Sequence, residues 1–146
     1  MLLVSTGFKS LILGPHAFAD IFAGGSIRIF AGARRNSADH AEPSSPIAVI
    51  RNSGALPGLT FVQDGPYVLG VGQWQIDATA PGTATWFSLV VAGDDGADTL
   101  SRPRVDGDIG STSAPSDMTL ANTTLSADTA VPVQTFVYTI PPLTGI

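Results

Sequence analysis

The sequence of 146 residues contains no cysteine, and it has only one lysine, Lys9, and one glutamate, Glu42. Without cysteine the chain can form neither a disulfide nor a metal site with thiolate ligands. Charged residues make up 13% of the chain, about half the share found in ordinary soluble proteins. The surface must therefore be neutral and polar, or partly apolar and covered by partners. A partly apolar surface that partners cover would indicate a protein that works inside an assembly.

Long apolar runs are also missing, since none approaches the roughly 18 residues that a membrane-spanning helix requires. We therefore expect no membrane partner. Hydrophobic residues nevertheless make up 44% of the chain, enough for a domain of this length to fold around a core. The 16 glycines, the 11 prolines and the preference for Asp over Glu indicate strands joined by turns, because these residues suit turns and disfavour helix interiors.

Positive charge is scarce and unevenly placed. The net charge is −5, and residues 53–146 carry nine acidic side chains against two basic ones. An acidic surface of this kind repels nucleic acid, so we expect no nucleic-acid partner. The adjacent pair Arg34 and Arg35 is too small to form a nucleic-acid site, and such a pair in a turn is more often a solvated tip or a contact with a protein partner.

Residues 5–23 predict a short helical arm near the N-terminus. Apolar side chains recur there at helical spacing, with a break at Gly14-Pro15 and an end at Gly24-Gly25. The side chains that can share one face are Phe8, Leu11, Ile12, Phe18, Ile21 and Phe22. This face can pack on the chain's own sheet or on a neighbouring subunit.

The rest of the chain shows short runs with strand character, separated by turns rich in glycine, proline and Asp. We expect strands at residues 26–30, 47–51, 59–62, 67–71, 73–77, 85–92, 104–109, 118–120 and 133–140. Residues 85–92 are the most apolar and predict a central strand buried on both faces, and Trp74 and Trp86 are expected in the core. The spacing predicts an all-β fold, an antiparallel β-sandwich with a jelly-roll-like topology. We expect a single domain over residues 1–146, with the arm in residues 1–25 and the sandwich in residues 26–146.

Three acidic residues, Asp94, Asp95 and Asp98, cluster with glycines in one turn. Clustered Asp oxygens in such a loop can bind calcium, which takes about six to eight oxygen ligands. The spacing of an EF-hand loop is absent, and Asp also suits tight turns for purely conformational reasons. The turn is therefore a weak calcium candidate, and we expect no other metal and no cofactor.

The sequence shows no catalytic constellation. Asp39 and His40 are neighbours in a polar loop, but there is no G-x-S-x-G motif that would hold a serine nucleophile beside them. Asp106 and Asp108 lie two apart and so project from one face of a single strand, whereas the carboxylates of a glycosidase usually come from different elements. The glycine-rich segments match neither a phosphate-binding loop nor a dinucleotide fingerprint. We therefore expect that the chain is not an enzyme.

Three short segments carry a resemblance to a known group of proteins. Residues 21–32 read IFAGGSIRIFAG, residues 37–41 read SADHA, and residues 82–87 read GTATWF. They resemble segments of small virion proteins of tailed bacteriophages. Those proteins show an apolar N-terminal helix, a pattern like F-x-G-G-x-[IL]-[RK]-I-[YF]-x-G, then S-A-D-x-A, and a later strand that opens G-T-A-T-[YW]-[YF]. The chain departs from the pattern in its loop, at Arg34-Arg35 and from Pro43 to Pro46.

The resemblance implies a structural part of a virion that is made in the cytoplasm of the bacterial host. Small jelly-roll-like proteins of this kind often cement or decorate the capsid. The resemblance therefore implies contacts with the major capsid protein and with copies of the chain itself, as a homodimer or homotrimer on the head shell. A neck, tail or baseplate component is the alternative, and a carbohydrate-binding module on a host-facing part of the virion is a further one.

We expect the partner contacts in the arm and in the loop that follows the first core strand. The residues expected to make them are Phe8, Leu11, Ile12, Phe18, Phe22, Arg34, Arg35 and His40. Deletion of residues 1–20 is expected to weaken assembly and to leave the sandwich folded.

Overall fold

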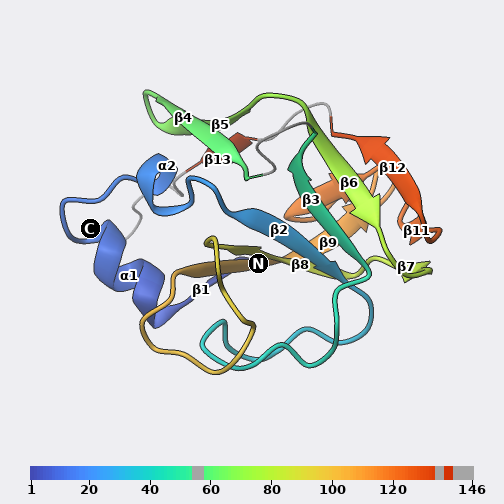
Figure 1. Cartoon of the computed structure of the whole chain (residues 1–146), viewed down its shortest axis with the longest axis horizontal. Helices are drawn as coiled ribbons and strands as arrows, with labels where there is room; N and C mark the ends of the chain where they lie inside the picture. The colour runs from blue at the N-terminus through green and yellow to red at the C-terminus, as the bar shows by residue number, and fades with distance from the viewer. Residues whose placement is uncertain (54–57, 134–136, 140–146) are drawn as a thin grey trace.

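The computed structural model describes residues 1–53, 58–133 and 137–139 (Figure 1). These residues contain two short helices, α1 (Thr6–Ile12) and α2 (Phe18–Ile21). The strands are β1 (Leu3–Val4), β2 (Ser26–Phe30), β3 (Ala48–Asn52), β4 (Thr60–Asp64), β5 (Tyr67–Val71), β6 (Trp74–Ala78), β7 (Gly82–Thr83), β8 (Trp86–Val90), β9 (Arg104–Ser111), β10 (Met118–Leu120), β11 (Thr124–Leu125), β12 (Thr129–Pro132) and β13 (Val137–Thr139).

Most strands pair antiparallel, which confirms the predicted all-β class. The main sheet has the order β1-β9-β8-β2-β3-β6-β12, and every pair along this path is antiparallel. β10 extends this sheet by pairing parallel with β9. Two smaller sheets are formed by β11 with β7, and by β13, β5 and β4 in that order. The β4–β5 hairpin lies on one side of the main sheet, opposite the loop that connects β2 to β3 (Figure 1).

The strands predicted from alternation lie close to where the structure has them. β2 and β5 have the predicted bounds, and β8 is buried at all five positions, as expected of a central strand. Trp74 and Trp86 are buried, as predicted. The strand predicted over residues 133–140 is described only in part, because residues 134–136 and 140 lie outside the described residues. The sequence patterns do not predict β1, β7, β11 or β12. The first three are only two residues long, and β12 lies at an edge of the main sheet.

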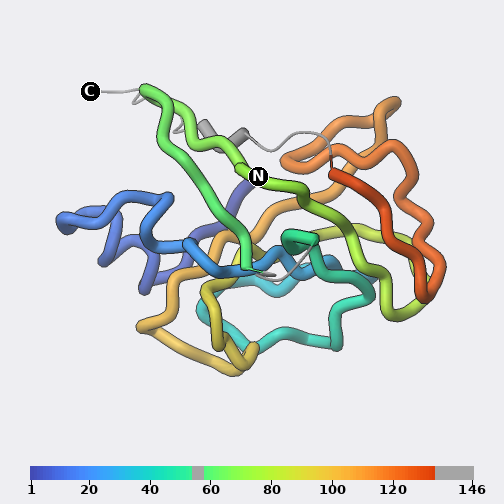
Figure 2. Tube along the Cα trace, turned by 45° about the horizontal axis from the view of Figure 1, so that its top comes forward, coloured from blue at the N-terminus to red at the C-terminus, as the bar shows by residue number. Residues whose placement is uncertain are grey.

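The main sheet has two different faces because side chains alternate along each strand. Ile27 and Ile29 of β2 lie in the apolar core together with Leu89 of β8, which pairs with Ile27. Residues of the helices and of the β4–β5 hairpin belong to the same core. The opposite face carries Arg28 of β2 and Ser88 of β8, which also pair with each other. Two long loops cover this second face, one after β2 and one after β8 (Figures 1 and 2).

The N-terminal arm folds back on the chain's own core. Ser5 caps α1, because its side chain accepts a hydrogen bond from the Phe8 amide at 3.1 Å. The rings of Phe8, Phe18 and Phe22 form one cluster with centroids 4.9 to 6.0 Å apart, and Phe18 also meets Phe61 of β4 at 5.7 Å. None of the three arm rings is more than 5% exposed. The prediction that they contact a partner is therefore corrected: these rings complete the core of their own chain.

The start of the chain is also part of the main sheet. β1 pairs with β9, with Leu3 opposite Asp106. Leu11 and Ile12 of α1 are partly buried, and Ile12 packs against the core. Deletion of residues 1–20 would remove a strand and two core rings, so it should destabilise the domain, contrary to the expectation from the sequence.

Phe18→Ala should lower the free energy of unfolding by about 3 to 5 kcal/mol, because it removes a buried ring and leaves a cavity in the aromatic cluster. The control is Leu100→Ala, at a side chain that is 72% exposed, and it should change that free energy by less than about 0.5 kcal/mol. Urea denaturation followed by tryptophan fluorescence measures both values. A Phe18→Ala result as small as that of the control would show that the arm is not part of the core.

Candidate functional site

The most polar part of the interior lies between the second face of the main sheet and the two loops that cover it. We call residues 31–47 the first loop and residues 91–103 the second loop, and both lie on the same side of the sheet (Figure 2). β9 contributes Arg104 and Asp106, which are two residues apart and therefore share this face. Both are fully buried, and Asp106 lies opposite Ser88 of β8.

Arg35 of the first loop is buried against Asp106. Its Nε and Nη2 atoms donate to the two carboxylate oxygens at 2.7 and 2.8 Å, and Nη2 also donates to Ser88 Oγ at 2.9 Å. Nη1 donates to the His40 carbonyl at 2.7 Å, and the guanidinium carbon lies 5.7 Å from the centre of the Trp86 ring. The Arg35 side chain is only 3% exposed. The prediction that Arg35 contacts a partner is therefore corrected: it fixes the first loop to the sheet.

Arg104 forms a second buried ion pair, with Asp94 of the second loop. Its Nε and Nη2 atoms donate to the two carboxylate oxygens, each at 2.7 Å, and neither side chain has exposed surface. Nη2 also donates to the Ala97 carbonyl at 2.7 Å, and Nη1 donates to the His40 carbonyl at 3.1 Å. Arg104 thereby joins β9 to both loops.

Both members of this second pair stay charged in the folded protein. Burial alone would raise the pKa of Asp94, but hydrogen bonds from the Arg104 guanidinium and from the Gly96 amide outweigh it and hold that pKa below its ordinary value. Burial alone would lower the pKa of Arg104, yet the Asp94 carboxylate raises it above its ordinary value. Loss of either partner would leave the other as an uncompensated buried charge.

A third ion pair and direct backbone hydrogen bonds join the two loops to each other. Arg28 of β2 pairs with Glu42 of the first loop, with 2.5 Å between Nη1 and Oε1. The Glu42 amide donates to the Gly96 carbonyl at 2.8 Å, and the Thr99 amide donates to the Asp39 carbonyl at 2.9 Å. The two loops are therefore one hydrogen-bonded unit, held on the sheet by three arginines. We call these arginines and their carboxylate partners the buried arginine network.

The three aspartates predicted as weak calcium candidates are each engaged by donors of the chain itself. Asp94 is held by Arg104, Asp95 pairs with Arg102, and Asp98 accepts a hydrogen bond from a backbone amide of the first loop at 2.6 Å. Asp94 and Asp95 also each accept a hydrogen bond from the amide two residues on, as Asp does in tight turns. Among the residues that the structure describes, no group of three or more His, Asp or Glu side chains is placed to hold a metal ion.

The last two predicted contact residues differ in exposure. The Arg34 side chain is 19% exposed, its Nη1 donates to the Met1 carbonyl at 2.8 Å, and the same atom lies 3.3 Å from Asp108 Oδ1. The His40 residue is exposed, while its backbone carbonyl is an acceptor for two buried arginines. His40 is therefore presented to solvent on a backbone that the buried arginine network holds in place.

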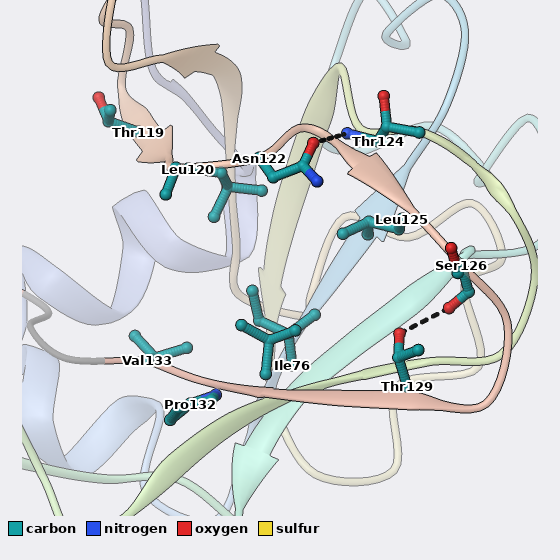
Figure 3. Close-up of a pocket in the computed structure, with 12 residues that line it drawn as sticks. Ile76, Thr119, Leu120, Asn122, Thr124, Leu125, Ser126, Thr129, Pro132 and Val133 are labelled. Atoms are coloured by element: carbon teal, nitrogen blue, oxygen red, sulfur yellow. Dashed lines mark hydrogen bonds between the residues drawn. The ribbon is translucent and has the colours of Figure 1, made fainter.

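A groove of about 740 Å³ lies between β12 and the segment that runs through β10 and β11 (Figure 3). Its floor is apolar, and Ile76, Leu120 and Leu125 point toward one another there. At the rim the Thr129 hydroxyl donates to a backbone carbonyl at 2.6 Å, and the Thr124 amide donates to a side-chain oxygen at 3.0 Å. None of the twelve lining residues in the described part of the chain is charged or aromatic. The groove therefore offers apolar contact and no acid–base group.

Comparisons with known proteins leave the interpretation to the sequence and the geometry. No family model matches the chain, and no curated protein or solved structure matches it. Neither of the two described helices has the length and apolar character needed to cross a membrane.

Asp106→Ala should lower the free energy of unfolding by about 3 to 5 kcal/mol, because Arg35 would be left as a buried charge without a partner. The matched control is Asp77→Ala on β6, which breaks the pair with Arg51, whose side chain is 45% exposed. An exposed pair contributes little, so the control should lose only about 0 to 1 kcal/mol. Thermal or urea unfolding of both variants measures the difference. Equal effects would contradict the conclusion that the buried arginine network anchors the first loop.

Proposed function

We propose that the chain is a structural protein of a tailed-bacteriophage virion, and that it cements or decorates the head shell by binding across the joints between major capsid subunits. Its partners are then the major capsid protein and copies of itself. This function needs no cofactor, no metal and no active site. It depends on the shape and rigidity of the surface.

The observation that carries the proposal is the rigid attachment of the two loops. The first loop presents exposed residues at His40 and from Pro43 to Ser45. The backbone beneath them is fixed where Arg35 and Arg104 bind the His40 carbonyl. A loop that is already ordered loses little conformational freedom on binding, so more of the contact energy appears as affinity. Such a surface suits a protein that must fit against fixed neighbours.

Two of the three segments that resemble phage virion proteins pair at the centre of the main sheet, and the third lies in the first loop. Residues 26–30 form β2, and residues 86–87 open β8, the strand that pairs with it. Residues 37–41 lie in the first loop, where Asp39 accepts hydrogen bonds from the amide and the hydroxyl of Thr6, each at 2.7 Å. The three segments thus connect the arm, the first loop and the centre of the sheet. This supports the proposal, because the segments lie in the centre of the sheet and in the first loop, which form the surface proposed to bind the shell.

The charge of the chain is compatible with a place on the outside of a DNA-filled shell. Its net charge of −5 gives it no electrostatic attraction for nucleic acid. A shell also offers many identical sites, and copies that contact each other as well as the shell gain avidity from contacts that are individually weak.

The proposal includes a more specific description of the all-β fold, a sandwich with a jelly-roll-like topology. Its two layers would be the main sheet and the sheet of β13, β5 and β4, which lie on opposite sides of the apolar core. The main sheet places strands that are distant in sequence side by side, as in the β8–β2 and β3–β6 pairs, and such sandwiches contain long connections of this kind.

Quantitative mass spectrometry of purified particles of the bacteriophage that encodes the chain tests the proposal. We expect a copy number of the same order as that of the major capsid protein in the same sample, because a cement protein repeats across the shell. Absence from the particle would overturn the virion role. Three, six or twelve copies would contradict the cement function and indicate a neck, tail or baseplate component, where cyclic symmetry limits the number of copies.

A further inference from the structure

The sequence contains three Asp-Gly pairs, at residues 64–65, 95–96 and 106–107. At such a pair the backbone nitrogen of the glycine can attack the side-chain carboxyl carbon of the preceding aspartate, because glycine has no Cβ that would hinder the approach. The three pairs have the same local chemistry. Differences between their reactivities in the folded protein must therefore come from the structure around each pair.

The pair at residues 106–107 is held inside the main sheet. Both carboxylate oxygens of Asp106 accept hydrogen bonds from Arg35, at 2.7 and 2.8 Å, and the Asp106 side chain has no exposed surface. Gly107 pairs with Phe87 of β8. The glycine nitrogen could reach the carboxyl carbon only if the buried ion pair and the strand pairing both opened.

The pair at residues 95–96 lies in the second loop, where hydrogen bonds occupy both of the reacting groups. Asp95 pairs with Arg102 and accepts a hydrogen bond from a backbone amide at 3.0 Å. The Gly96 amide, which would be the nucleophile, donates to the buried Asp94 carboxylate at 2.8 Å. This pair can react only when the second loop opens, and the buried arginine network resists that opening.

The pair at residues 64–65 lies in the turn between β4 and β5, which Figure 2 shows at the end of a projecting hairpin. Both residues are exposed. Within the described part of the chain, nothing donates a hydrogen bond to the Asp64 carboxylate, and the Gly65 amide donates to no backbone carbonyl. Gly65 has a φ of 59°, which favours glycine over residues with a Cβ, so this turn requires the small residue that makes the pair reactive.

The turn must open slightly for the reaction, and little holds it closed. Attack requires a rotation about the Cα–C bond of Asp64, out of its extended conformation. The cross-strand pair that resists this rotation is Asp64 with Tyr67, which is 46% exposed. The first buried side chains along the hairpin, Phe61 and Val68, lie further from the turn. Opening of such an exposed end costs much less than opening of the core.

We propose that residues 64–65 are a site of spontaneous isoaspartate formation in the folded protein. The Gly65 nitrogen forms a bond to Asp64 Cγ and loses its proton, and the hydroxyl of the carboxyl group leaves with that proton as water. The product is a succinimide ring. Water then opens the ring: cleavage of the new bond restores aspartate, whereas cleavage of the original backbone C–N bond gives isoaspartate. The net composition is unchanged, and water is the only co-reactant.

The reaction would change the exposed end of the hairpin as the protein ages. Isoaspartate carries the main chain through the former side chain, so it adds one carbon to the backbone at a two-residue turn. The pairing of Asp64 with Tyr67 would be lost first. The contact of Phe61 with Phe18, at 5.7 Å between ring centres, lies beyond the turn and should persist. The modification would therefore alter a surface and leave the core intact, and it does not depend on a place in a virion.

Incubation of the folded protein in water labelled with heavy oxygen tests the proposal, because opening of the succinimide ring introduces one solvent oxygen. Chymotrypsin cleaves after Phe61 and Tyr67 and so separates residues 62–67 from the other two Asp-Gly pairs. Mass spectrometry should find the label in residues 62–67, together with a second chromatographic form of that peptide. Labelling there should be faster than at the other two pairs by more than about tenfold, since those two react only from opened states.

Three comparisons isolate the effect of the structure. In concentrated urea the three pairs should take up label at similar rates, because their local sequences are alike. Asp64→Glu keeps the charge but would need a six-membered ring, which forms far more slowly, so residues 62–67 should stay unlabelled. Asp95→Glu is the matched control and should leave the labelling of residues 62–67 unchanged.

Two results would each overturn the proposal. One is equal labelling of the three pairs in the folded protein, and the other is labelling of residues 62–67 no greater than in Asp64→Glu. Neither result changes the expected copy number in the particle, so the modification site and the virion function can fail separately.

Discussion

The side chains of Arg35 and Arg104 lie beneath the two loops and have almost no exposed surface. Each binds both carboxylate oxygens of an aspartate. Removing such a pair from water costs several kcal/mol per ion, so it is tolerated only where the remaining donors also find acceptors. Those acceptors are largely loop carbonyls, and the His40 carbonyl serves both arginines. A loop that moved away would leave buried donors without partners. The buried arginine network and the two loops must therefore form together.

This constraint also determines what is left on the surface. Three of the six arginines, Arg28, Arg35 and Arg104, lie in the network, together with two aspartates and Glu42. A chain with so few charged residues thus places a large part of its charge inside. The network pairs three positive with three negative side chains, so the outer surface keeps the whole net charge of −5, and the loops and the groove are ordered features of that surface. The proposed cement function needs such a surface, because binding to fixed neighbours favours an interface that is already ordered.

The sequence predicts the longer strands, such as β2 and β5, because their apolar patterns reflect burial directly, but it does not predict the two-residue strands β1, β7 and β11 or the edge strand β12. It does not predict the network, because the adjacent pair Arg34 and Arg35 is typical of an exposed turn. Neighbouring residues in extended chain point in opposite directions, however, so one arginine of such a pair can be buried while the other is not. Two usable signals were present: Arg104 and Asp106 share a strand face, and Ser88 interrupts the most apolar strand. From the sequence, the apolar face of the arm could pack on the chain's own core or on a neighbouring subunit. Only the tertiary structure distinguishes these two arrangements.

Hydrogen exchange of individual amides, followed by NMR under native conditions, tests most directly whether the two loops are one rigid unit with the sheet. The amides of Glu42 and Thr99 bond across the loops. They should exchange about as slowly as the amides of β8, since they can open only when the buried arginine network opens. The amide of Ser44, at the exposed end of the first loop, should exchange much faster. Exchange of Glu42 and Thr99 at the rate of Ser44 would contradict the central claim that the network holds the loops on the sheet.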